Sequence, residues 1–208
     1  YWGSFNRFYK NWLLKVYYCL DNIFVMKSHE QYWKETFGRK YLDKLVISDI
    51  PVLISKPTLE VSNDSICMIY AGLIERKHRS PYYLLAVLRE LSKSIDFEFL
   101  FYSKGDCENE IAKAVKEVNG IKQKGYVTQE EIEYALLNAN FLVSIGNSVS
   151  RSVPSKIINY LSYGKPIIHF SSQKNDVCND YLKNYPLALV IDQSISVKEA
   201  CKEICEFI

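Results

Sequence analysis

Residues 144–170 read SIGNSVSRSVPSKIINYLSYGKPIIHF, and this stretch decides the fold. It holds the end of an apolar strand, a polar loop, a helix that opens at Pro154 and stops at Gly164, and a second apolar strand. Proline suits the first turn of a helix, where its missing N–H would have no helical partner. Lys156 falls in that turn, beside unpaired backbone donors at the positive end of the helix dipole, a combination that favours an anion such as phosphate. Taken alone, the stretch also fits any strand–helix–strand unit of a parallel sheet.

Apolar segments and amphipathic helices alternate from about residue 64 to the end of the chain. Strands are predicted at 66–71, 97–102, 121–126, 141–145, 166–170 and 187–191, with helices between and after them. Capping boxes mark two helix starts, at Thr128 and Ser196. Such alternation indicates a parallel sheet covered on both faces. Six units most simply form a doubly wound, Rossmann-like α/β sheet with the strand order 3-2-1-4-5-6.

In that order, the loops after the first and fourth strands flank the switch point, where ligands bind beyond the carboxyl ends of the strands. The first loop begins at Gly72 and carries Arg79, whose forked guanidinium suits phosphate oxygens better than lysine does. Alone, this basic segment also fits a solvated turn. The second loop leads into the Lys156 helix, so the topology predicts that both loops meet at one anion-binding crevice.

Residues 1–60 form a region of their own, with short strands predicted at 23–26 and 45–48 and a helix at 30–37. Prolines and a polar run mark a linker, which places the domain boundary between 1–60 and 61–208. The chain opens in an aromatic helix whose apolar stripe includes Phe5, Phe8 and Trp12. We expect Trp12 and its stripe neighbours to be largely buried; a freely exposed stripe would instead favour a membrane or partner surface.

The composition indicates a globular protein, with 48% hydrophobic and 24% charged residues. A net charge of +2 gives no reason to expect a nucleic-acid partner. The sequence contains no run of about 18 apolar residues, so no membrane span is predicted. The six cysteines form no C-x-x-C pair, so neither a metal site nor a disulfide framework is predicted, and a reducing cytoplasm is the natural compartment. His169, in the apolar segment IIHF, is predicted to be a hydrogen-bonded core histidine.

The pattern P-S-K-I-x-x-Y-L-x-x-G-K-P-I-I, residues 154–168, resembles the C-terminal half of bacterial glycosyltransferases of the GT-B fold, the group called group 1 or family 4. The resemblance extends over about 64–192. It implies that residues 61–208 form the domain that binds the nucleotide-sugar donor, and that 1–60 are a remnant of the N-terminal domain with its crossover. In that family the helix holds the diphosphate and ribose of the donor.

The resemblance also implies a set of donor-binding residues: Gly72, Arg79, Tyr126, Val127, Asn147, Ser155, Lys156 and Asn159. Three of these have other interpretations from the sequence. Tyr126 also fits a core residue, Asn147 a local turn, and Asn159 a solvent-facing helix position. The chain departs from the family at its E-x7-E pair, because Arg151 and Asn159 stand where carboxylates usually contact the donor.

The implied activity is transfer of a hexosyl or related group from a nucleoside diphosphate sugar to an acceptor, such as a lipid-linked or surface-polysaccharide saccharide. No cofactor or metal is expected to be obligatory, and catalytic residues are expected in an N-terminal half. The full-length protein is expected in the cytoplasm, with peripheral association at the inner face of the membrane. Two alternatives remain, a nucleotide-sugar-binding domain without transfer activity and a nucleotide-sugar epimerase of the same architecture.

Overall fold

The computed structural model of the chain describes residues 7–37, 39–48, 54–57, 65–148 and 155–208. Contacts divide the chain into two compact units, Tyr1–Pro51 and Val52–Ile208. Arg151 and Pro154, which the sequence analysis singled out, lie outside the described residues.

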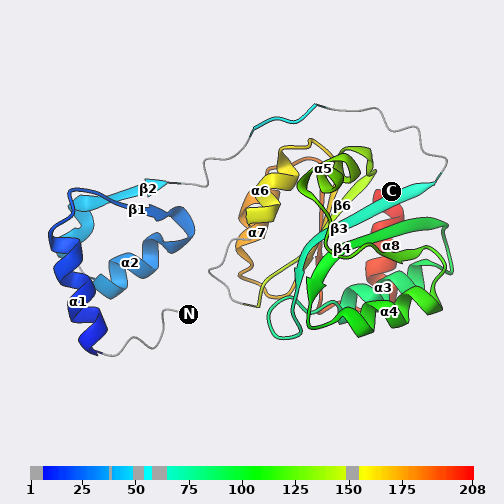
Figure 1. The fold of residues 1–208 in the computed structure, drawn as a ribbon, viewed down its shortest axis with the longest axis horizontal. Coiled ribbons are helices and arrows are strands. Elements are labelled where there is room, and N and C mark those ends of the chain that lie inside the picture. The colour runs from blue at the N-terminus through cyan, green and yellow to red at the C-terminus, as the bar shows by residue number, and fades with distance from the viewer. Residues whose placement is uncertain (1–6, 38, 49–53, 58–64, 149–154) are drawn as a thin grey trace. The chain divides into compact units, whose positions relative to one another are not determined.

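The larger unit is built on a six-stranded parallel sheet with the order β5-β4-β3-β6-β7-β8 (Figure 1). Its strands are β3 (Ile66–Ile74), β4 (Phe97–Gly105), β5 (Ile121–Gln123), β6 (Phe141–Ile145), β7 (Ile167–Ser171) and β8 (Ala188–Asp192). Numbered within this unit, the order is 3-2-1-4-5-6, which confirms the predicted doubly wound α/β sheet. The switch point lies between β3 and β6.

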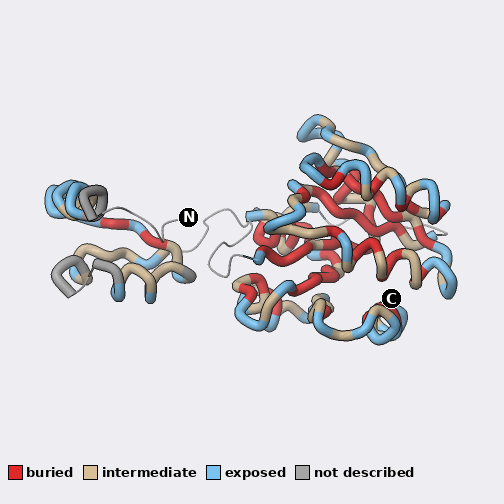
Figure 2. Tube along the Cα trace, turned by 90° about the horizontal axis from the view of Figure 1, so that it is seen from below, coloured by how far each residue is buried: buried red, intermediate tan, exposed pale blue. Residues whose placement is uncertain are grey.

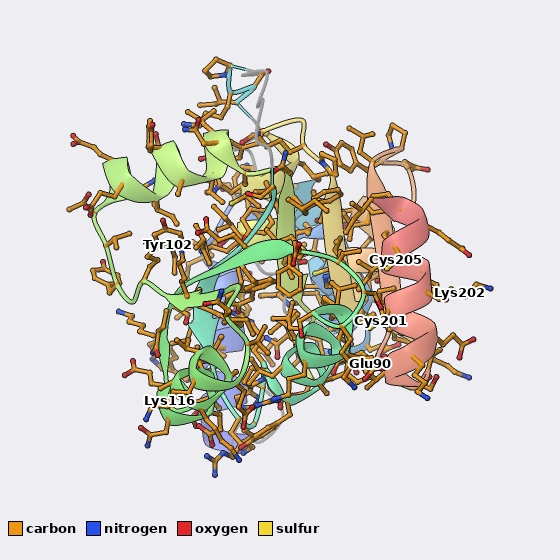
Figure 3. The ribbon with its side chains drawn as sticks, turned by 90° about the vertical axis from the view of Figure 1, so that its right-hand side faces the viewer. Glu90, Tyr102, Lys116, Cys201, Lys202 and Cys205 are labelled. Atoms are coloured by element: carbon orange, nitrogen blue, oxygen red, sulfur yellow. The ribbon has the colours of Figure 1, made fainter. Side chains whose placement is uncertain are left out.

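Helices cover both faces of this sheet. They are α3 (Tyr82–Leu91), α4 (Glu108–Glu117), α5 (Gln129–Asn138), α6 (Ser155–Leu161), α7 (Val177–Leu182) and α8 (Val197–Phe207). α3 packs against α4 and α8 on one face, and α6 packs against α7 on the other (Figure 1). The central strands β6 and β7 and most of β3 are buried between these layers, whereas the edge strands β5 and β8 are partly exposed (Figure 2). On α8, Cys201 is buried against α3, whereas Cys205, one turn later, is exposed (Figure 3).

Side-chain caps fix several helix starts where the sequence predicts them. Thr128 and Glu131 form a complete capping box at α5, with both reciprocal hydrogen bonds present. Ser196 accepts a hydrogen bond from the backbone N–H of Glu199 at α8, and Asp176 caps α7 through the N–H of Cys178. These local signals explain why the order of elements is readable from sequence.

The crevice opens because β3 follows β4 much further than it follows β6. β3 and β4 stay in register from the pair Ile66 and Phe97 to the pair Ile74 and Gly105. Gly105 permits this, since a Cβ there would lie 1.7 Å from the carbonyl oxygen of Ile74. β3 leaves β6 after Tyr70. Beyond that point the buried Tyr160 hydroxyl of α6 accepts a hydrogen bond from the N–H of Ala71 at 2.9 Å, in place of a strand partner.

The third predicted strand is shorter than expected. β5 ends at Gln123, and Gly125 has φ +71°, a left-handed conformation that turns the chain out of the sheet. Tyr126 therefore lies outside the strand and is 82% exposed. The alternative interpretation of Tyr126 as a core residue is wrong.

The smaller unit contains α1 (Arg7–Tyr18), β1 (Ile23–Met26), α2 (Glu30–Phe37) and β2 (Leu45–Ser48), with β1 and β2 paired in parallel. Trp12 is 51% exposed, so the prediction that it is largely buried is wrong. The ring of Tyr17 meets that of Trp33 on α2 with centroids 5.0 Å apart, a contact at the C-terminal end of α1 that leaves Trp12 at the surface. Phe5 and the side chain of Phe8 lie outside the described part. Among the described helices, none has the length and apolarity needed to cross a membrane.

Candidate functional site

A cavity of about 690 Å³ lies at the carboxyl ends of β3 and β4 and along the loop after β5. Gly72, Tyr126, Val127 and Lys156, all predicted donor-site residues, are in its wall. The polar wall residues that sequence reasoning did not assign to the site include Ser103, Lys104 and Glu131. A volume of this size suits a small ligand, and the carboxyl edge of a doubly wound sheet is where ligands bind.

Lys156 reaches from α6 to the backbone of β3 at Gly72. A Cβ added to Gly72 would lie 3.4 Å from Lys156 Cδ and 3.5 Å from its Nζ. The lysine chain therefore lies in van der Waals range of the strand backbone at this position. Burial, and then the charge of Arg79, lower the pKa of Lys156 to about 8.

Arg79 lies close enough to Tyr70 and Lys156 to affect both. Burial raises the pKa of Tyr70 to about 12, and the Arg79 charge opposes that rise. The Arg79 Nε is buried and has no hydrogen-bond partner within the described ranges. Neither Arg79 nor Lys156 forms an ion pair with any carboxylate that the structure describes. Two neighbouring cations thus stand partly desolvated without a counter-charge, an arrangement that an anion would stabilise.

The loops after β3 and β6 meet, as the topology predicts. The backbone N–H of Ser148 donates to the carbonyl of His78 at 2.9 Å, and the Ser148 hydroxyl donates to the carbonyl of Lys77 at 3.0 Å. Arg79 itself is held by a tight turn, with its N–H donating to the carbonyl of Glu75 at 2.8 Å. The turn and the contact with the β6 loop fix the backbone that carries the guanidinium.

Tyr126 forms an exposed aromatic surface at the edge of the cavity. The Nζ of Lys104 lies 4.6 Å from the centre of its ring, a cation–π contact that orients the tyrosine. Glu131 is oriented in turn by hydrogen bonds from the N–H and hydroxyl of Thr128, at 3.0 and 3.1 Å. This end of the cavity therefore offers a ring for stacking and a fixed carboxylate.

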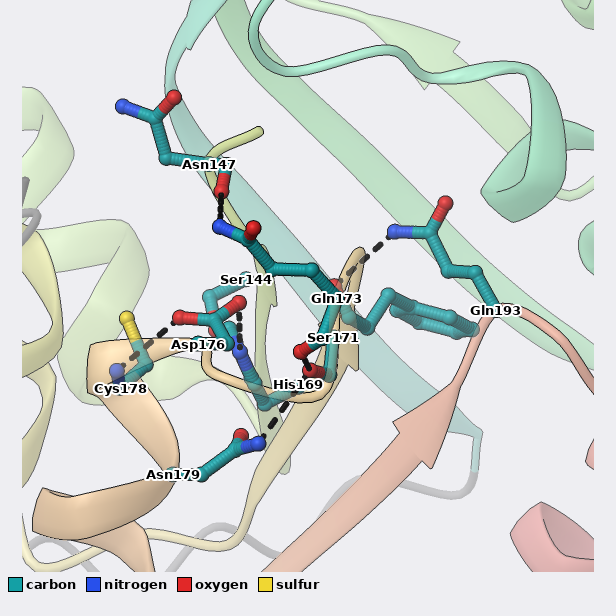
Figure 4. Close-up of polar contacts among 10 residues, drawn as sticks. Ser144, Asn147, His169, Ser171, Gln173, Asp176, Cys178, Asn179 and Gln193 are labelled. Carbon is teal, nitrogen blue, oxygen red and sulfur yellow. Dashed lines mark hydrogen bonds and ion pairs between the residues drawn. The ribbon is translucent and has the colours of Figure 1, made fainter. Parts of the chain in front are cut away.

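The other four predicted residues, Arg79 among them, lie outside the cavity wall. Asn147 is 8% exposed, and its backbone carbonyl accepts a hydrogen bond from Gln173 at 2.8 Å (Figure 4). Ser155 is exposed as the first residue of α6. Asn159 is partly buried and lies beside the ring hydroxyl of Tyr163.

A buried polar network lies at the carboxyl end of β7 (Figure 4). Ser144 Oγ is 2.7 Å from Nδ1 of His169, whose Nε2 is 3.2 Å from Asp176 Oδ2. This confirms the prediction of a hydrogen-bonded core histidine. Burial alone would raise the pKa of Asp176, but the hydrogen bond and charge of His169 bring it below its usual value.

The same network contains the one grouping of metal-ligand type found among the described residues. The ligand atoms of His169, Asp176 and Cys178 lie within 4.8 Å of one another, all of them buried. The His169 and Asp176 side chains hydrogen-bond each other, and Asp176 also accepts from the Cys178 N–H at 3.0 Å. These bonds account for the polar atoms without an ion, so the network serves as internal support for the loops.

No protein-family model matches the sequence, and no curated protein does either. Solved structures match its fold. A TarM structure superposes with a TM-score of 0.69 at 14% identity, covering 99% of this chain and 40% of that one. The pneumococcal O-GlcNAc transferase GtfA, solved with UDP and GlcNAc, gives 0.63 at 17% identity, covering 96% and 40%. The lipopolysaccharide outer core galactosyltransferase WaaB gives 0.63 at 14% identity, covering 90% and 53%.

These proteins are all GT-B glycosyltransferases, and this chain has their fold, as the resemblance predicts. The described sheet corresponds to a Rossmann-like domain of that fold. The chain spans 40% of the TarM and GtfA chains and 53% of WaaB.

Proposed function

We propose that this chain supplies the donor-binding part of a glycosyltransferase and holds the diphosphate of a nucleoside diphosphate sugar. The observation that carries the proposal is the pair of partly buried, uncompensated cations, Lys156 and Arg79, of which Lys156 lies against Gly72 at the switch point. A diphosphate brings at least two negative charges and several acceptor oxygens to this place. Structures of the fold neighbours TarM and GtfA were solved with UDP, which is consistent with such a ligand.

The cavity gives the donor an orientation. With the diphosphate at Lys156, the nucleoside extends toward Tyr126, whose exposed ring offers a stacking surface for the base. Backbone groups at Val127 border the same space, and the carboxylate of Glu131 is placed to accept hydrogen bonds from ribose. The sugar then projects away from the sheet edge, toward the acceptor.

In the transfer step, an acceptor hydroxyl oxygen forms a bond to the sugar C1 and releases its proton, while the bond between C1 and the diphosphate oxygen breaks and negative charge develops on the departing phosphate. Lys156 and Arg79 stabilise that charge, and such electrostatic stabilisation is usually the largest single contribution to catalysis. Because the protein supplies the positive charge, the proposal requires no divalent metal. As acceptor we propose a saccharide that is lipid-linked or part of a surface polysaccharide. The full-length protein would act on it in the cytoplasm, at the inner face of the membrane.

Calorimetry tests the donor site directly. We expect one of UDP, GDP, ADP or TDP to bind the purified chain, with the same affinity in the presence of a chelator. Lys156→Ala or Arg79→Ala should weaken the diphosphate by about tenfold or more, the loss typical of a charge-assisted hydrogen bond, and leave the nucleoside unaffected. Lys116→Ala, at an exposed position on α4 (Figure 3), is the matched control and should change neither. If none of the four nucleotides binds, the proposal is contradicted.

A second candidate, a domain that binds a nucleotide sugar without transferring it, is favoured by the missing carboxylates. Arg151 and Asn159 stand at the two positions of the family's E-x7-E pair. A product assay with the full-length protein separates the two functions. Sugar released to water or transferred to an acceptor supports the transferase, whereas tight binding without turnover supports the second candidate.

A further inference from the structure

Ser103 carries a buried hydroxyl that has no partner within the described ranges. The residue is 3% exposed, and its Oγ forms no hydrogen bond. The side chains that precede it on the same face of β4, Phe99 and Phe101, are both fully buried. An alanine would fit this apolar setting without leaving a polar atom unpaired, and unpaired buried hydroxyls are uncommon because they cost free energy.

The register of the sheet places this hydroxyl toward the cations. Ser103 is paired with Gly72 in the parallel β3–β4 ladder, and paired positions project side chains on the same face. The Cβ direction of Gly72 points to Lys156 Nζ and to the Tyr70 hydroxyl, each 3.5 Å away. Ser103 therefore stands one strand over, on the side of the sheet that faces the Lys156 ammonium, and it lines the same cavity.

A second buried donor without a partner among the described residues belongs to Arg79, whose charge also acts on Lys156. The buried Nε of Arg79 also has no partner in the described part of the chain, and the Arg79 guanidinium lies beside Tyr70. A single protein group that paired with both donors would remove the penalty, yet none does. An unpaired hydroxyl in the cavity that Lys156 lines, together with a second cation whose charge reaches Lys156, suggests that the missing partner is an anion with several oxygens.

We propose that the Ser103 hydroxyl is a ligand-binding group that donates a hydrogen bond to a phosphate oxygen of the nucleoside diphosphate. This inference rests on the proposed function and adds a residue to it, from a strand that carries no predicted site residue. The hydroxyl is left unpaired in the free protein so that it is already positioned when the ligand arrives. The unpaired hydroxyl lowers the stability of the free protein and raises its affinity for the diphosphate.

The proposal predicts opposite effects of one substitution on stability and on binding. Ser103→Ala removes an unpaired buried hydroxyl, so the melting temperature of the free protein should rise by about 2–4 °C. The same variant should bind UDP, or whichever nucleoside diphosphate the wild type binds, about tenfold more weakly. Its affinity for the nucleoside should be unchanged, since the contact is to phosphate.

Ser171 on β7 is the matched control, because it is also 3% exposed but is fully paired (Figure 4). Its Oγ donates to the carbonyl of Gln173 at 3.0 Å and accepts from Asn179 Nδ2 at 3.3 Å. Ser171→Ala should therefore lower the melting temperature and leave UDP binding as it is. Comparing the two variants separates the effect of removing an unpaired hydroxyl from the general effect of replacing a buried serine.

Scanning calorimetry and titration calorimetry on the two variants decide the matter. A lower melting temperature for Ser103→Ala would mean that the hydroxyl is paired inside the protein, which overturns the inference. Unchanged diphosphate affinity in a wild type that binds would overturn it while leaving the proposed function intact. Equal weakening of nucleoside and diphosphate would refute the phosphate assignment. A wild type that binds no nucleoside diphosphate would overturn the proposed function itself, and this inference with it.

Discussion

The lowered pKa of Lys156 predicts that diphosphate binding is coupled to proton uptake. With a pKa of about 8 in the free protein, the fraction of charged Lys156 falls from about nine tenths at pH 7 to about one tenth at pH 9. A bound diphosphate stabilises the ammonium, so its pKa in the complex rises well above that range. The complex then holds more protons than the free protein, and affinity must fall as pH rises.

The magnitude follows from the same pKa. Between pH 7 and pH 9 the dissociation constant for UDP should increase by about tenfold, and the proton uptake per bound UDP should rise from about 0.1 to about 0.9. The terminal phosphate loses its last proton near pH 6, so the ligand's own ionisation does not offset this trend. Titration calorimetry at pH 7, 8 and 9, in buffers of different ionisation enthalpy, measures both quantities.

Lys156→Arg provides the control, because a guanidinium stays charged throughout this range. The variant should bind UDP with an affinity that does not change between pH 7 and 9 and without proton uptake. For the free protein the sign is the reverse. The folded pKa of about 8 lies below the ordinary lysine value of 10.5, so the unfolded chain holds more protons between these values, and this lysine makes folding more favourable as pH rises through that window. Constant wild-type affinity from pH 7 to 9 would refute the reasoning.

Two further substitutions test the framework around the site, each by chemical unfolding. Gly146→Ala should lower the free energy of unfolding by about 2–4 kcal/mol, because its Cβ would lie 2.0 Å from Asp176 Oδ2 and displace the carboxylate from His169. Gly164→Ala is the control: this residue has φ +64° and open space around it, so the loss should be only about 1 kcal/mol. Similar losses for both would contradict the close approach to Asp176. Tyr160→Phe should cost about 1–3 kcal/mol by leaving the N–H of Ala71 unpaired, whereas Tyr82→Phe, at a 45% exposed side chain, should stay within about 0.5 kcal/mol. No loss for Tyr160→Phe would show that water replaces the hydroxyl.

The sheet could be predicted from sequence because its signals are local. Apolar runs, the T-x-x-E box at Thr128 and the stop at Gly164 each act within a few residues. The strand order then followed from the simplest winding of six units. The same reasoning failed at Trp12, whose helical spacing states only which residues share a face. What covers that face depends on tertiary contacts, which the pattern does not contain.

In the candidate site too, the residues readable from local sequence were predicted, whereas those that depend on tertiary contacts were not. Gly72 and Lys156 were found because a strand end and a helix start are both readable in the chain. Ser103 was missed because its significance depends on the pairing of β4 with β3, a contact between residues far apart in sequence. The rotation of α6 likewise decides that Asn159 lies beside Tyr163 rather than in the cavity wall.

Two polar clusters in this domain differ in how far their groups are paired: the network around His169, and the group near Gly72 and Lys156. Around His169, three side chains from different elements hydrogen-bond one another in a largely buried setting, so the protein's own side chains complete this network. At the carboxyl edge of the sheet, the Ser103 hydroxyl and the Arg79 Nε have no partner among the described residues, and Lys156 has no ion-pair partner there. Asn179 Oδ1 and the Tyr163 hydroxyl are also buried and unpaired in the described part of the chain, so the feature that sets the β3–β4 edge apart is the combination of unpaired donors with an uncompensated ammonium. We propose that an anionic ligand completes this combination.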